Sequence, residues 1–172
     1  MKVTGRCHCG QISFEAEIDP SQVRICHCTD CQTLTGTAFR TTVPSLPSSF
    51  VLKSGTPKIY IKTAESGNKR VHAFCPECGT PIYAAAPGAN PPSHGLRVGT
   101  LDRRAELRPT RQGWCRSAVL WSMDLTGVER FEANNSIEQN PHTNSSAALP
   151  RPAVPGASAD TGCRSRPRPP AG

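Results

Sequence analysis

Seven of the nine cysteines in this 172-residue chain lie in three short groups, and their spacing is the strongest chemical signal in the sequence. The groups are Cys7-x-Cys9, Cys26-x-Cys28-x2-Cys31 and Cys75-x2-Cys78. Thiols this close along one loop rarely form an unstrained disulfide, whereas groups that converge can share one tetrahedral metal ion. The spacing therefore predicts that these seven residues bind zinc.

The seven ligands divide unequally between two predicted sites. Three of them, Cys26, Cys28 and Cys31, already lie on one loop. Catalytic zinc commonly takes three protein ligands and keeps one exchangeable position, whereas structural zinc takes four. The remaining two pairs, Cys7 with Cys9 and Cys75 with Cys78, are therefore expected to close a structural four-cysteine site.

Other interpretations of the cysteines and histidines stay open at this point. The second site is also compatible with a purely structural role, if Cys115 or a histidine supplies its fourth ligand. A redox dithiol at Cys75-x2-Cys78 would leave the other five grouped cysteines without a role. His8 and His27 each lie between two cysteines and are expected to point away from the metal, because alternate residues of an extended segment share a face. His72 and His94 have no local spacing that predicts ligation.

An open zinc site with three thiolates is electron-rich and is suited to hold a fourth thiolate from a substrate. Bound zinc lowers the pKa of a thiol below its free value of about 8.5, so the expected chemistry is delivery of a thiol to an electrophilic carbon. Basic side chains would be needed to hold an anionic thiol. The sequence does not rank the candidates, which are Arg24, Arg40, Lys69, Arg70 and Arg97.

Composition favours a small zinc-stabilised domain in a reducing compartment. Hydrophobic residues make up 36% of the chain and aromatic residues 5%, so the core is thin and needs a metal or another cross-link. No signal-like or membrane-spanning apolar stretch is visible, and the cytoplasm is the expected location. The formal charge of +7 falls to about +4 once seven thiolates and two zinc ions are counted, which weakens the case for nucleic-acid binding.

The sequence pattern predicts a mainly β domain over residues 1–132 and a disordered tail over 133–172. In the range 11–18, Ile12, Phe14, Ala16 and Ile18 alternate as one face of a strand. Further short strands are expected at 50–52, 58–62, 71–74, 81–84, 96–98 and 118–121. The tail is rich in Pro and Ser, and its Cys163 is expected to be an unpaired thiol.

An ordered set of motifs resembles one family. The motifs are RCHCG at 6–10, CHCTDC at 26–31, TGTAF at 35–39, FCPECGTPIY at 74–83 and VGTLD at 98–102. From about Thr4 to Phe131 the chain is similar to the glutathione-dependent formaldehyde-activating and centromere-protein-V family, including its closing strands at 114–121. The resemblance implies an Mss4-like fold of short antiparallel sheets, structural zinc on the four-cysteine set and a second zinc on the three-cysteine set. It also implies that glutathione adds to formaldehyde with its sulfur at the open zinc position.

The leading hypothesis is therefore a carbon–sulfur lyase-type enzyme, similar to S-(hydroxymethyl)glutathione synthase, with Cys26, Cys28 and Cys31 at the catalytic zinc. It predicts two zinc ions per chain, glutathione as co-substrate, a small-molecule thiol and an aldehyde as partners, and no membrane. The alternative is a non-enzymatic zinc module that binds protein or nucleic acid. The basic balance and three arginines of the tail, Arg164, Arg166 and Arg168, motivate that alternative.

Overall fold

A computed structural model describes residues 1–65 and 67–133. The chain divides into two units, Met1–Met123 and Asp124–Gly172, and the described part of the second unit is 124–133. The tail predicted for 133–172, with Cys163 and its arginines, thus lies almost entirely outside the described residues. No described helix has the length and apolar character of a membrane span.

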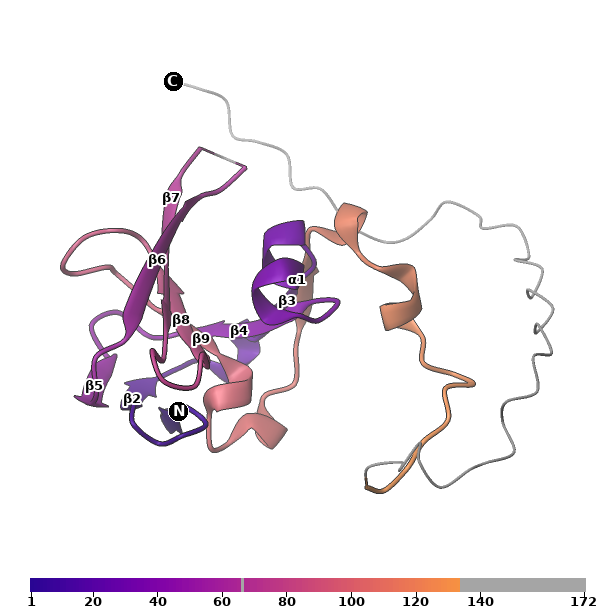
Figure 1. Ribbon diagram of the computed structural model, residues 1–172, viewed down its shortest axis with the longest axis horizontal. Coiled ribbons are helices and arrows are strands. Elements are labelled where there is room, and N and C mark those ends of the chain that lie inside the picture. Colours follow the sequence, from indigo (N-terminus) through magenta and orange to yellow (C-terminus); the bar gives the residue numbers. More distant parts are fainter. Residues whose placement is uncertain (66, 134–172) are drawn as a thin grey trace. The chain divides into compact units, whose positions relative to one another are not determined.

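The first unit is mainly β, as predicted, with ten strands and one short α-helix among the described residues (Figure 1). The strands are β1 Lys2–Arg6, β2 Ser13–Glu17, β3 Arg24–Cys26, β4 Arg40–Pro44, β5 Val51–Ser54, β6 Lys58–Thr63, β7 Lys69–Phe74, β8 Pro81–Ala85, β9 Gly95–Arg97 and β10 Arg111–Gly113. The helix α1 spans Thr29–Thr35. Short 3-10 turns lie at Pro20–Gln22, Val98–Thr100, Arg104–Glu106, Cys115–Ser117 and Leu120–Met123.

Two sheets hold the unit together. The smaller has the order β1-β2-β5 and the larger β10-β3-β4-β9-β8-β7-β6. All strand pairs are antiparallel except β10 with β3. Isolated bridges pair Gly5 of β1 with Leu101, and Ile18, directly after β2, with Ser45, directly after β4. They connect the smaller sheet to segments that flank the larger one.

The alternating pattern of the second strand is confirmed, because Ile12, Phe14, Ala16 and Ile18 are all buried. Opposite Phe14 in the ladder stands Gly5. A Cβ atom at Gly5 would lie 2.4 Å from the Phe14 ring, so only glycine lets the ring cover the neighbouring strand. Phe14 then contacts Phe50, and Phe50 contacts Tyr83 of β8, at ring-centroid distances of 5.5 and 5.1 Å. This aromatic chain carries the core from the smaller sheet to the larger one.

The prediction of a strand at 118–121 is wrong, as is the expectation of closing strands at 114–121. The structure has 3-10 turns at Cys115–Ser117 and Leu120–Met123 instead. Trp114 has a left-handed backbone with φ of 60°, which interrupts an extended path. Leu120 and Trp121 are 80% and 67% exposed. The apolar residues that suggested a half-buried strand therefore do not form a buried face.

Candidate functional site

The first cysteine cluster joins the N-terminal hairpin to the turn after β7. The sulfurs of Cys7, Cys9, Cys75 and Cys78 all lie within 4.8 Å of one another. The Sγ atoms of Cys7 and Cys9 are 3.4 Å apart, and those of Cys9 and Cys75 are 3.7 Å apart. Cys7 and Cys75 are buried, whereas Cys9 is exposed at the rim. Four donors thus converge from segments about seventy residues apart in sequence.

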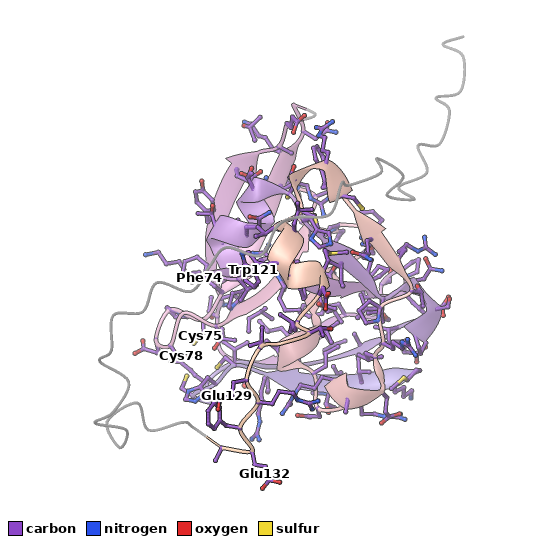
Figure 2. The ribbon with its side chains drawn as sticks, turned by 90° about the vertical axis from the view of Figure 1, so that its right-hand side faces the viewer. Phe74, Cys75, Cys78, Trp121, Glu129 and Glu132 are labelled. Carbon is purple, nitrogen blue, oxygen red and sulfur yellow. The ribbon has the colours of Figure 1, made fainter. Side chains whose placement is uncertain are left out.

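Two similar turns aim these sulfurs at each other. In the first, Cys7 N–H donates to the Ile12 carbonyl and Gly10 N–H donates to the Cys7 carbonyl. In the second, Cys75 N–H donates to the Thr80 carbonyl, and Gly79 N–H donates to the Cys75 carbonyl. Figure 2 shows Cys75 and Cys78 on the second turn, directly after Phe74 at the end of β7.

Thr80 connects the two turns and sets the charge of one sulfur. Its Oγ1 accepts from the backbone N–H of His8 at 3.1 Å and lies 3.1 Å from the Cys78 sulfur. This hydroxyl lowers the pKa of Cys78 to about 5, followed in effect by backbone N–H donors. A thiolate at neutral pH is the form that binds a metal cation.

The second cluster lies where β3 ends and α1 begins. The sulfurs of Cys26, Cys28 and Cys31 lie within 4.8 Å of one another, with 3.5 Å between those of Cys26 and Cys28. Cys28 is the N-cap of α1, and its sulfur accepts from the Cys31 backbone N–H at 3.4 Å. The helical turn therefore brings Cys31 back toward Cys28, because residues three apart share one face of a helix.

The three sulfurs of the second cluster share protons unequally. A hydrogen bond from the Cys31 thiol lowers the pKa of Cys26 to about 5, and Arg40 adds a smaller effect of the same sign. The same hydrogen bond, together with burial, raises the pKa of Cys31. A divalent cation among these sulfurs would replace the shared proton, since each ligand binds metal as a thiolate.

The donor sets of both clusters suit zinc. Zn–S bonds of about 2.3 Å in a tetrahedron place neighbouring sulfurs about 3.8 Å apart. The sulfur–sulfur distances of 3.4, 3.7 and 3.5 Å are close to that value. Soft thiolates without carboxylates favour zinc over magnesium or calcium. Among residues 1–65 and 67–133, no histidine, carboxylate or further cysteine has a ligand atom within 4.8 Å of every sulfur of either cluster.

The histidines that flank or neighbour the cysteines have other contacts. His27 is fully buried, and its Nε2 pairs with the Gln112 side chain at 2.7 Å, so it points away from the cluster as expected. His94 stacks on Phe50 at a centroid distance of 4.3 Å. His72 Nδ1 lies 3.1 Å from Arg97 Nη2 and 3.4 Å from Arg40 Nη1.

The structure ranks the basic residues that the sequence left equal. Arg40 pairs with Cys26 across β3 and β4 and is 3% exposed, and Arg97 on β9 is 7% exposed. Arg24 and Lys69 are exposed and Arg70 is half-buried. Sequence reasoning did not place His72 and Gln112 at the site, because both reach it through strand pairings that no local spacing indicates.

Comparison with known proteins places this geometry in a family context. The family model described as "Glutathione-dependent formaldehyde-activating enzyme" matches residues 2–117, which contain all seven clustered cysteines. The crystal structure of a Rhodobacter sphaeroides protein is similar in fold, with a TM-score of 0.50 and 21% sequence identity over 64% of this chain and 99% of that one. The chain therefore belongs to the glutathione-dependent formaldehyde-activating enzyme family.

Proposed function

We propose that the chain is a zinc-dependent carbon–sulfur lyase-type enzyme that adds a thiol such as glutathione to formaldehyde or a related small electrophile. Cys26, Cys28 and Cys31 hold the reactive zinc in this proposal, and the four-cysteine cluster holds a structural one. One observation carries it: three sulfurs converge, and within residues 1–65 and 67–133 no fourth protein ligand joins them. Membership of the family supports the choice of thiol and aldehyde.

The reaction is an addition that needs no oxidant or reductant. The thiol sulfur forms a bond to the carbonyl carbon, the carbonyl π pair moves to oxygen, and that oxygen takes up the proton that the thiol released. When bound, zinc supplies a position for the substrate sulfur and lowers its thiol pKa below the free value of about 8.5. The product is an S-hydroxymethyl thioether, and the reverse direction is the lyase reaction.

The protein's own residues hold the three sulfurs in fixed positions. The hydrogen bond from Cys31 N–H orients Cys28, and the buried His27, anchored to Gln112, fixes the chain between Cys26 and Cys28. Gln32 donates from its amide to the His27 and Ser117 carbonyls at 2.7 and 2.8 Å, which fastens α1 to the segments on either side. Such outer contacts keep metal ligands in place before substrate arrives.

The test is the rate at which formaldehyde and glutathione form their adduct, followed by exchange NMR with 13C-formaldehyde. The zinc-loaded chain should exceed the uncatalysed rate, and Cys28→Ser should return it to that rate. Native mass spectrometry should show two zinc ions in the parent and one in the variant. Cys163→Ser is the matched control and should keep both the rate and the two ions. A Cys28→Ser protein that retains the full catalysed rate would contradict the proposal.

A further inference from the structure

Two arginine side chains are buried beside the three-cysteine cluster, on one face of the larger sheet. Cys26 pairs with Arg40, and Thr42, two residues along β4, pairs with Arg97 of β9. Because side chains two apart on a strand and directly paired side chains share a face, Cys26, Arg40 and Arg97 all point to the same side. Pairing of β9, β8 and β7 places His72 on that side too, beyond Ala84 and Gly95. The small side chain of Ala84 and the missing one of Gly95 let His72 meet both arginines.

Neither arginine has an acidic partner. The ion pairs among the described residues join Lys53 to Glu15, Lys62 to Asp30, Arg103 to Glu106 and Arg116 to Glu65. Asp30, the acidic residue of α1, is therefore engaged by Lys62. The Nε atoms of Arg40 and Arg97 are buried and have no hydrogen-bond partner in the described part of the chain. Buried guanidinium groups without a carboxylate are rare, since burial of an unpaired charge is costly.

The charges around the cluster leave room for one more anion. Three thiolates and a divalent cation sum to one negative charge, whereas the two guanidiniums carry two positive charges. Burial, and then the nearby Arg40, lower the pKa of Arg97 to about 9, so both arginines stay charged at neutral pH. His72 adds no charge, because burial and the two arginines lower its pKa to about 3. Its Nδ1 faces both arginines as an acceptor.

The arginines open onto a pocket large enough for a small organic anion. The pocket has a volume of about 470 Å³, within the range typical of small-molecule sites. Arg40, Arg97 and His72, which contact one another, form a polar end of the pocket. Lys58 is a further basic side chain of the lining, and Leu34, Tyr60 and Phe74 are among its other side chains. The ligand should therefore combine an anionic group with a short, partly apolar body.

From these observations we propose that Arg40 and Arg97 form a carboxylate-binding site beside the three-cysteine cluster, which selects a low-molecular-mass thiol that carries a carboxylate. The part that concerns a thiol rests on the proposed function, whereas the carboxylate site stands on the arginines and the pocket. Guanidinium groups match the planar, bidentate geometry of a carboxylate better than a lysine does. Binding of the carboxylate at the pocket end would hold the thiol sulfur of the same molecule near Cys26, Cys28 and Cys31.

The test uses ophthalmate, the glutathione analogue that has a methyl group in place of the thiol, and isothermal titration calorimetry with the full, zinc-loaded chain. The parent protein should bind ophthalmate, and its diester should bind about tenfold more weakly or worse, since a charged hydrogen bond is lost. Arg97→Gln should show a similar loss, and Arg97→Lys should restore part of the affinity. Arg108→Gln is the matched control, because Arg108 is exposed and does not line the pocket.

Circular dichroism and zinc content identify variants that fail to fold, and Arg40→Lys replaces Arg97→Gln if that variant does. The proposal is overturned if the parent does not bind ophthalmate, if the diester binds equally well, or if the arginine variants keep the parent affinity. These outcomes separate this proposal from the proposed function. Arginine-dependent ophthalmate binding without catalysed adduct formation would support the carboxylate site and contradict the proposed enzymatic function. Cysteine-dependent catalysis with arginine-independent binding would support the enzymatic function and contradict the carboxylate site.

Discussion

The two cysteine clusters use the same ligand atom in different surroundings. The four-cysteine cluster is built from two turns that face each other, and its sulfurs take hydrogen bonds from Thr80 and from the backbone. The three-cysteine cluster lies on a strand–helix junction, and the buried Arg40, paired with Cys26, lines a pocket. The first cluster contains two buried cysteines and the exposed Cys9, whereas all three sulfurs of the second are half-buried beside Arg40, which lines the pocket. In the function proposed here, the surroundings, more than the donor atoms, distinguish the structural zinc site from the reactive one.

The largest expected difference between the clusters is their effect on folding. Cys75→Ser removes a ligand that links segments distant in sequence, and structural zinc contributes on the order of 10 kcal/mol of apparent binding free energy. The variant should lose most of its β-sheet signal in far-UV circular dichroism. Cys28→Ser should keep that signal, since its cluster lies on one local junction. Equal unfolding of the two variants would erase the proposed distinction.

Removal of zinc should also distinguish the two clusters. A chelator added slowly should take one zinc ion per chain first, because a three-thiolate site has a position open to attack and a four-thiolate site does not. We expect the first ion to leave with little change in circular dichroism and with loss of adduct formation. The second should leave together with the sheet signal. A colorimetric zinc assay run beside circular dichroism checks this, and loss of both ions in one step would contradict it.

Substitutions of residues that contact the cysteine clusters should have smaller effects than substitutions of the cysteines themselves. Thr80→Val removes the hydroxyl that lowers the pKa of Cys78, so this thiol should ionise less readily and zinc affinity should fall about tenfold. Gln112→Ala leaves the buried His27 without its partner and should cost on the order of 1 kcal/mol of stability. Competition with a chromophoric chelator measures the first effect and urea denaturation the second.

Thr63→Val, at an exposed position near the end of β6, is the control for the threonine substitution and should leave zinc affinity unchanged. If Thr80→Val binds zinc as tightly as this control, the hydroxyl has no part in holding the metal.

The sequence predicted the mainly β class and the grouping of cysteines because both depend on local patterns. The alternation at Ile12, Phe14, Ala16 and Ile18 marks a half-buried strand without reference to the rest of the chain. Cys28 and Cys31 likewise meet through a single helical turn, and Cys26 precedes them at the end of β3. The two remaining pairs were joined by counting ligands, and the structure brings their sulfurs within 4.8 Å.

Features that arise from pairing between distant strands could not be predicted from local sequence patterns. The strands β1, β3, β4 and β10 were not predicted, and β3 and β10 have only three residues each. The position of Arg40 opposite Cys26, and of Arg97 one strand further, follows from register rather than from composition. The apolar pattern at 118–121 wrongly predicted a strand, because the side chains there are half-buried or exposed rather than packed against a sheet.

The smallest expected effect concerns His72 at the charged end of the pocket. Its positively charged neighbours distinguish it from an ordinary buried histidine. Arg97 and Arg40 face it directly, and Lys62 and Arg70 add positive charge nearby. Its pKa is lowered to about 3 by burial first and by these charges second. An unfolded histidine titrates near 6.5, so below that pH the unfolded chain binds a proton that the folded chain does not. Stability should therefore fall as the pH falls from about 6.5 toward 3.

His72→Asn keeps an acceptor for the arginines and removes the titration. Urea midpoints at pH 7.5 and 5.5, with zinc present throughout, should fall more for the parent than for this variant. His8→Asn, at an exposed position outside the pocket, should lose as much as the parent. A parent and a His72→Asn protein with equal losses would mean that His72 gains its proton in the folded state. That result would contradict the lowered pKa of His72 and the acceptor role of its Nδ1 toward Arg40 and Arg97.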